Sequence, residues 1–225
     1  MATSHDVEAD KVAAARQLLE RCGLEHAALS GDQAIERAGK IATAAMDYER
    51  TQRPDLGAVF DEHVADEFQL QDVDATMSTM ADDPYLDHVP VMTGGVGREE
   101  VRHFYANHFI GKWPPDTEVA PLSRTVGESR VVDELIVSFT HTNEMPALLP
   151  GIAATGRRVK LPHVVVMGFE GDKVAYEHIY WDQASALVQV GVLDPSGLPV
   201  TGAEQARKLL DKSLPTNEMI SSTRA

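Results

Sequence analysis

The sequence is poor in cysteine, in basic residues and in long apolar runs. Its single cysteine, Cys22, cannot form an intramolecular disulfide. Lys and Arg total 20 against 35 Asp and Glu, a formal net charge of −15, which argues against nucleic acid or an anionic membrane as the main partner. No run approaches the ~18 apolar residues of a membrane span, and no apolar stretch near the N-terminus resembles a signal peptide. We therefore expect a cytoplasmic protein with no nucleic-acid or membrane partner.

The chain also has no Gly/Ser/Pro-rich linker that would divide its 225 residues. One main domain is therefore expected, although the chain is longer than the ~150 residues typical of one domain. We assign residues 1–29 to an N-terminal helical extension, residues 30–195 to an α+β domain, and residues 196–225 to a C-terminal helix and tail. The end of this tail, residues 213–225, is expected to be disordered.

Apolar residues in the N-terminal half recur at helical spacing. Gly23 and Pro54 follow two of these periodic segments and are typical of helix ends. The pattern predicts helices over residues 12–21, 32–53, 56–64 and 97–109, a short strand at 67–71 and a helical turn at 75–80.

The C-terminal half instead alternates in the manner of strands joined by turns. Residues 161–169 are rich in β-branched and apolar side chains, residues 170–173 have turn chemistry, and residues 174–182 follow as the partner strand. Two earlier strands are predicted at 117–126 and 129–142. Helices first and hairpin-linked strands afterwards indicate an α+β fold, with helices packed on a curved antiparallel sheet.

Residues 177–183, EHIYWDQ, hold the densest set of proton-handling groups in the chain. Side chains in a strand alternate between the two faces, so His178, Tyr180 and Asp182 share one face. Glu177, Ile179 and Trp181 share the other, which we interpret as a packing face. The first face suggests acid/base chemistry.

The residues of this stretch also suggest a family. Residues 177–191 resemble the last strand and following helix of SnoaL-like proteins, the polyketide-cyclase branch of the nuclear transport factor 2-like superfamily. The similarity extends to residues 94–100, to the pair Phe104-Tyr105, and to residues 123–127 and 155–157. In all it covers about residues 30–195.

The resemblance implies a cone-shaped fold, in which three or four helices close one side of a strongly bent sheet around an apolar pocket. Such proteins include cyclases, dehydratases, isomerases, epoxide hydrolases and lyases, mostly without metal or organic cofactor, and also non-catalytic binders. We expect an enzyme that acts on a small apolar carbonyl, lactone or hydroxylated aromatic compound. The alternatives are a binding or assembly module without catalysis and an enol-lactone or epoxide hydrolase.

Asp182 matches the aspartate that SnoaL-type cyclases use as general acid/base. An apolar pocket would raise its pKa towards the range that is useful at neutral pH. We therefore predict Asp182 as the catalytic group, with His178 tuning it or orienting a substrate oxygen and Tyr180 donating to a carbonyl. The structural alternative is that Asp182 caps the helix that begins at Ala184. His178 and Tyr180 could equally be half-buried residues with ordinary hydrogen bonds.

Other candidates lie on elements that would line the same pocket. The predicted substrate-binding residues are His163, on an apolar strand face, Tyr48, at the end of a helix, and His141 and Glu144, beside an apolar loop at 145–150 that could act as a lid.

Three histidines on different strands, His141, His163 and His178, could converge on a metal. No HxH or HxxxH element supports such a site, so we expect no metal and no cofactor. Members of the superfamily commonly associate through the outer face of the sheet. We therefore expect a homodimer, with Trp181 as its apolar anchor.

Overall fold

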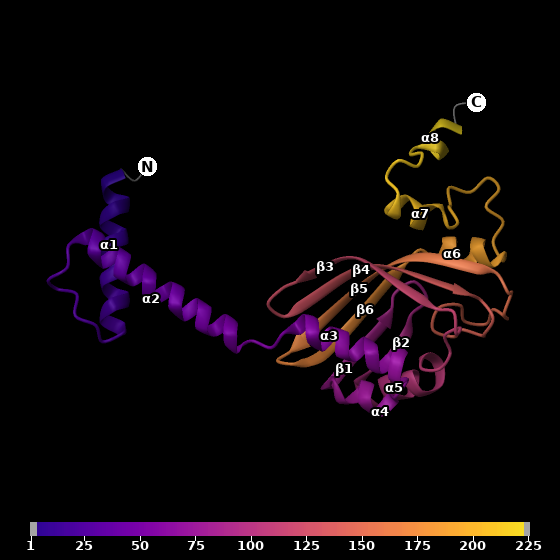
Figure 1. Ribbon diagram of the computed structural model, residues 1–225, viewed down its shortest axis with the longest axis horizontal. Coiled ribbons are helices and arrows are strands. Elements are labelled where there is room, and N and C mark those ends of the chain that lie inside the picture. The colour runs from indigo at the N-terminus through magenta and orange to yellow at the C-terminus, as the bar shows by residue number, and fades with distance from the viewer. Residues whose placement is uncertain (1–3, 223–225) are drawn as a thin grey trace. The chain divides into compact units, whose positions relative to one another are not determined.

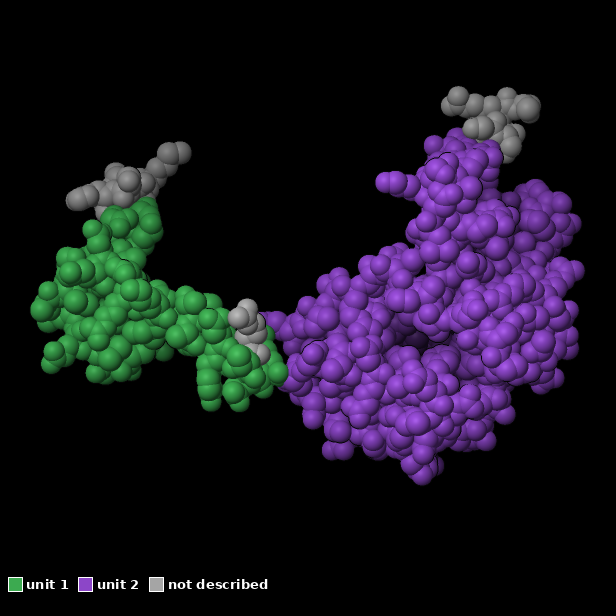
Figure 2. Space-filling view, viewed as in Figure 1, with its two compact units in different colours: residues 1–53 green, residues 54–225 purple. Residues whose placement is uncertain are grey.

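The computed structural model describes residues 4–222, which divide into two compact units at the link between Arg53 and Pro54 (Figure 2). The predicted boundary after residue 29 therefore lies inside the first unit. Helices α1 (Ser4–Arg21) and α2 (Gly31–Gln52) pack on each other through a small core of Ala15, Leu19, Ala34 and Ala38. This contact places α2 in the N-terminal unit rather than in the α+β domain.

The second unit is built on one six-stranded sheet in the order β2-β1-β6-β5-β4-β3 (Figure 1). Its strands are β1 (Met80–His88), β2 (Thr93–Val96), β3 (Glu118–Val126), β4 (Arg130–Thr140), β5 (Arg158–Glu170) and β6 (Lys173–Trp181). The four C-terminal strands confirm the predicted meander. The α+β class with a curved sheet is likewise confirmed.

Strands β1 and β2 are the part of the sheet that the sequence pattern missed. Pro84 interrupts the alternation in β1, and the register with β6 shifts between Met80 and Tyr85, where a proline can be accommodated without breaking a regular ladder. The β1–β6 pair is parallel, so the sheet is not wholly antiparallel as predicted.

Several helices pack against this sheet (Figure 1). On one face lie α3 (Leu56–Ala65), η1 (Asp66–Leu70), α4 (Val73–Ser78), α5 (Gly97–Phe104) and η2 (Tyr105–Phe109). Helices α6 (Gln183–Val190) and α7 (Glu204–Leu210) pack against β5, where the Gln189 side chain of α6 bonds the Lys160 backbone.

Two predictions about local structure were wrong. Residues 67–71 are not a strand, because α3 continues directly into the π-helical turn η1, which ends where Gln71 adopts a left-handed backbone conformation (φ 51°). A short helix, α8 (Glu218–Ser222), lies in the end segment that was predicted to be disordered. Within residues 4–222, no helix combines the length and the apolar character needed to cross a membrane.

Candidate active site

A cavity of about 490 Å³ lies inside the second unit, between the concave face of the sheet and the helices α3, η1 and η2. This volume falls in the range typical of small-molecule sites. Its wall is mostly apolar and aromatic, with side chains such as Phe68, Phe109 and Trp113. The polar groups that line it are Asp61, Glu67, Gln69, His88, Arg124, Asp133, His163 and Glu177.

The pairing of β5 with β6 decides which side chains of β6 reach this cavity. His163 is paired with Trp181, Val165 with Ile179, and Met167 with Glu177. Paired residues lie on the same face of a sheet. Glu177, Ile179 and Trp181 therefore face inward and are 4%, 8% and 9% exposed.

The inward-facing Glu177 belongs to a buried polar cluster around His63. His63 Nε2 lies 3.0 Å from Glu177 Oε1 and 3.3 Å from Glu67 Oε1. The Tyr105 hydroxyl donates to Glu177 Oε1 at 2.8 Å and lies 3.2 Å from the same imidazole nitrogen. All four side chains are almost fully removed from solvent.

The hydrogen bonds of Thr79 fix one proton of His63. The Thr79 hydroxyl donates to the Thr76 carbonyl oxygen at 2.7 Å, so it can only accept from His63 Nδ1, which lies 2.5 Å away. His63 Nδ1 therefore carries a hydrogen. Burial alone would lower the pKa of His63, but the carboxylates of Glu177 and Glu67 outweigh it and raise the pKa to about 10. His63 is thus an imidazolium at neutral pH.

The two carboxyl groups beside this imidazolium titrate differently. Burial raises the pKa of Glu67, and His63 offsets this only in part. Burial opposes ionisation of Glu177 too, but the positive charge of His63 and the hydrogen bonds from His63 and Tyr105 bring its pKa below the usual value. The imidazolium thus lies between one carboxyl group whose pKa is lowered and one whose pKa is raised. That distribution is the one expected where charge is costly to bury.

Two π-helical turns position this cluster. Glu67 lies in η1, one turn after His63 of α3, and Tyr105 is the first residue of η2, which continues α5. A π turn widens the helix and is frequent at functional sites. Here the two turns bring a carboxyl and a phenol to the same imidazole.

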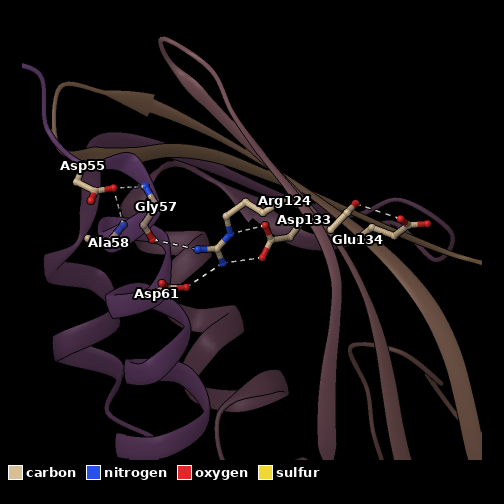
Figure 3. Close-up of polar contacts among 8 residues, drawn as sticks. Asp55, Gly57, Ala58, Asp61, Arg124, Asp133 and Glu134 are labelled. Carbon is tan, nitrogen blue, oxygen red and sulfur yellow. Dashed lines mark hydrogen bonds and ion pairs between the residues drawn. The ribbon is translucent and has the colours of Figure 1, made fainter. Parts of the chain in front are cut away.

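A second polar group ties α3 to the sheet at the wall of the cavity (Figure 3). Arg124 donates from Nε and Nη2 to the two carboxylate oxygens of Asp133, at 2.6 and 2.7 Å, and from Nη2 to Asp61 at 2.8 Å. Its guanidinium carbon also lies 4.6 Å from the centre of the Phe60 ring. These contacts hold Arg124 in a fixed bidentate pair.

The donor atoms of His63, Glu67 and Glu177 lie within 4.8 Å of one another, close enough to hold a metal ion together. In this structure the same atoms are joined by hydrogen bonds, with the Tyr105 hydroxyl among them. The shared protons already supply the positive charge that a cation would bring. We therefore interpret the cluster as a proton-sharing site.

The comparison with family models decides the family. The SnoaL-like domain matches residues 60–177, just over half of the chain. The protein belongs to this family. The predicted resemblance is thereby confirmed, and the matched segment contains His63, Glu67, Tyr105 and Glu177. A search among curated proteins gave no match.

Three solved structures similar to this SnoaL-like protein share 15–22% identity with it. AclR from Streptomyces galilaeus, described as a proposed hydroxylase, shares 22% identity and a TM-score of 0.48, over 62% of this chain and 86% of that one. A proposed SnoaL-like polyketide cyclase from Jannaschia sp. CCS1 shares 18% identity and a TM-score of 0.48, over 64% and 99%. A protein with a ketosteroid isomerase-like fold from Catenulispora acidiphila, in complex with trimethylamine, shares 15% identity and a TM-score of 0.46, over 66% and 100%.

The predicted catalytic residues of the SnoaL-like domain lie outside the cavity. Asp182 is the N-cap of α6, accepting from the Ser185 backbone N–H at 3.1 Å, and its other oxygen accepts from the Gln205 side chain at 2.8 Å. His178 and Tyr180 face the opposite side of the sheet from Glu177, and Tyr180 is 42% exposed. The assignment of the two faces of β6 was therefore wrong, and the capping alternative for Asp182 is the observed one.

The predicted substrate-binding residues are scattered. His163 lines the cavity, and its role in binding stays a prediction. His141 is fully buried and bonded to Thr155 at 3.1 Å, away from the cavity wall, and Glu144 is exposed. Tyr48 lies on α2 in the N-terminal unit and is 66% exposed, so its role also stays a prediction. Because His178 faces outward and His163 inward, the three histidines do not converge on a metal.

Sequence reasoning missed His63, Glu67, His88 and Tyr105, and it assigned Glu177 to packing. One signal was available: His63 and Glu67 are four residues apart, the spacing that joins side chains on one helix face. It was overlooked because residues 67–71 were interpreted as a strand.

Proposed function

We propose that this protein is an acid/base enzyme, in which Glu177 removes a proton from a small, mainly apolar compound and Glu67 protonates an oxygen of the same compound. The observation that supports it most is the pair of carboxyl groups, one with a raised and one with a lowered pKa, on the wall of one apolar cavity. Environments that separate the pKa values of two such groups are typical of acid/base pairs.

The geometry gives each group a distinct task. His63 and Tyr105 both contact Glu177 through Oε1, and no group in residues 4–222 hydrogen-bonds Oε2, so that oxygen can accept a proton from a bound ligand. Glu67 contacts His63 at 3.3 Å and also hydrogen-bonds with Tyr105, and in this proposal its protonated form donates towards the cavity. His63 and Tyr105 are positioning residues that hold the proton distribution in place.

A ketone with an α-hydrogen illustrates the proposed step. Glu177 takes the proton from carbon while Glu67 gives its proton to the carbonyl oxygen, which yields a neutral enol and exchanges the charges of the two carboxyl groups. Return of a proton to carbon then completes an isomerisation or an exchange. Cyclisation, dehydration and retro-aldol cleavage use the same pair of transfers.

Deuterium exchange into α-tetralone in heavy water, followed by NMR, tests this proposal without knowledge of the natural substrate. We expect the protein to accelerate exchange at the α-carbon, because the cavity offers both an acid and a base. Glu177→Gln should lower the enzymatic rate by about 10²-fold or more, the usual contribution of one general base. Glu67→Gln should also lower it. Asp182→Asn, at the cap of α6, should leave it unchanged.

Three results would count against the proposal. Exchange that is no faster with the protein than without it would favour a non-catalytic binding module. A normal rate in folded Glu177→Gln would exclude Glu177 as the base. A loss confined to Asp182→Asn would restore the original prediction. Circular dichroism of each variant shows whether it is folded.

A further inference from the structure

Two histidines on one wall of the cavity are not used by the proposed proton transfers. His88 comes from the end of β1 and His163 from the middle of β5, and each is 4% exposed. Both contact Trp181, with ring centroids at 5.7 Å for His88 and 5.6 Å for His163. The two imidazoles therefore flank one indole on the inner face of the sheet.

Hydrogen bonds to the backbone fix the tautomer of both rings. His88 Nδ1 lies 3.2 Å from the Thr93 carbonyl oxygen, and His163 Nδ1 lies 3.1 Å from the Leu161 carbonyl oxygen. A carbonyl oxygen only accepts, so each Nδ1 carries a hydrogen. Burial lowers the pKa of each ring to about 4, which leaves both rings neutral at pH 7. Each Nε2 is then a bare acceptor.

Neither Nε2 is satisfied within the protein. No group in residues 4–222 hydrogen-bonds to it. Among the same residues, only one side-chain nitrogen or oxygen is both fully buried and without a hydrogen-bond partner, and it is His141 Nε2. The two unpaired Nε2 atoms of His88 and His163 are therefore not fully buried. The Nε2 atoms of His88 and His163 are therefore accessible from the cavity that both residues line.

Two further charged groups of the cavity offer a ligand no free donor. Glu177 is ionised, and the guanidinium of Arg124 is committed to Asp133 and Asp61. A ligand that offers only acceptors, such as a simple ketone or lactone, would leave both imidazole nitrogens without a partner, and that costs free energy. An anionic ligand would also meet the carboxylate of Glu177.

We propose that the cavity takes a neutral aromatic diphenol or a similar dihydroxy compound, whose two hydroxyl groups donate to His88 Nε2 and His163 Nε2. This rests on the proposed function, since it names the class of compound on which the same site would act. The aromatic side chains Phe68, Phe109 and Trp113 supply an apolar wall suited to a ring.

Binding to the full-length protein, measured by calorimetry, tests this class with a matched pair of probes. Naphthoresorcinol has two phenolic hydroxyls, and its dimethyl ether keeps the ring but cannot donate. We expect the diphenol to bind at least about tenfold more tightly, which corresponds to about 1.4 kcal/mol. His163→Phe and His88→Phe should each lower the affinity for the diphenol by about that factor, and the affinity for the ether should stay nearly unchanged. Tyr180→Phe, on the outer face of β6, is the control.

Equal affinities of the two probes, or tighter binding of naphthoate, would overturn the inference. If a phenylalanine variant does not fold, NMR of ¹⁵N-histidine-labelled wild-type protein replaces it: the diphenol should shift the Nε2 resonances of His88 and His163, and the absence of a shift would also overturn the inference. Because binding needs no turnover, the same titration in Glu177→Gln separates the two proposals. Selective diphenol binding without catalysed exchange would contradict only the proposed function.

Discussion

Histidines in this one domain are held in opposite charge states by their neighbours. His63 is as buried as His163, yet two carboxyl groups beside it keep it protonated, whereas His163 faces a backbone carbonyl and an indole. Burial penalises the charged form in both cases, and only an adjacent opposite charge reverses the outcome. Sequence alone could place His163 on an inward strand face but could not supply the neighbours of His63, which come from helices and strands far apart in the chain.

The neutral state of His163 predicts a pH dependence of stability. Its pKa is about 4 in the folded protein, below the ordinary value of 6.5. The unfolded chain therefore binds a proton first as pH falls, so stability is retained above pH 6.5 and lost between 6.5 and 4. One such histidine should lower the free energy of unfolding by about 2 kcal/mol when the pH falls from 7.5 to 5.

Urea unfolding at these two pH values, for wild type and His163→Phe, measures this contribution. The variant has no imidazole at this position. Its free energy of unfolding should therefore fall by about 2 kcal/mol less on acidification than that of the wild type. His88, which has the same lowered pKa, remains in both proteins and cancels in the comparison. An equal loss in the two proteins would contradict the prediction.

A single β-bulge explains why the faces of β6 were assigned the wrong way round. Glu170 pairs with Lys173 and Phe169 with Val174, as in a regular hairpin, but Gly168 then pairs with Tyr176. Ala175 is thus an extra residue on β6. Without it His163 would pair with Tyr180, and the predicted catalytic face would point inward. One extra residue exchanges the two faces of a strand, and alternation in the sequence does not reveal it.

The glycine at this bulge is a local requirement of the element. A Cβ added at Gly168 would lie 2.1 Å from Cε1 of the Tyr176 ring, so the ring or the strand would have to move. We expect Gly168→Ala to lower the free energy of unfolding by about 1–3 kcal/mol, the usual cost of overpacking.

Thermal and urea unfolding of Gly168→Ala checks this expectation. The matched control is Gly127→Ala, where an added Cβ would meet only the Arg130 carbonyl oxygen at 3.4 Å, an ordinary contact. The combined variant Gly168→Ala/Tyr176→Ala removes the ring that the new methyl group meets. It should lose less stability than the sum of the two single changes. Full additivity would argue that the two residues do not meet.

Other elements show how far local patterns reach. Helices α2 and α3 were predicted within a few residues of their observed bounds from apolar residues at helical spacing and from Pro54. In the structure, a capping box of Ser30 and Gln33 begins α2, and Asp55 caps α3. Strand β1 was missed, because its partner β6 lies about ninety residues further along the chain and only that pairing makes a strand of a segment containing Pro84.

At the scale of the whole molecule, the expected dimer contact must involve other residues, because the side of β6 that carries Trp181 faces inward. Trp181 is 9% exposed and lines the interior beside His163, so it cannot serve as the outer anchor that the sequence suggested. The outer face instead carries a group of aromatic residues. Tyr85 and Tyr176 contact the ring of His178 at 5.4 and 4.8 Å, and Tyr180 lies on the same face.

We propose that any homodimer forms through this outer aromatic face, since an exposed apolar patch of this kind is typical of protein–protein contacts. Light scattering after gel filtration should then give a dimer for the wild-type protein and a monomer for Tyr180→Lys, because a lysine would place a charge in the centre of the contact. Trp181→Ala should stay dimeric but unfold more easily, by about 3–5 kcal/mol, since it removes a large buried ring. A monomeric wild type, or a dimer that survives Tyr180→Lys, would rule out this face as the interface.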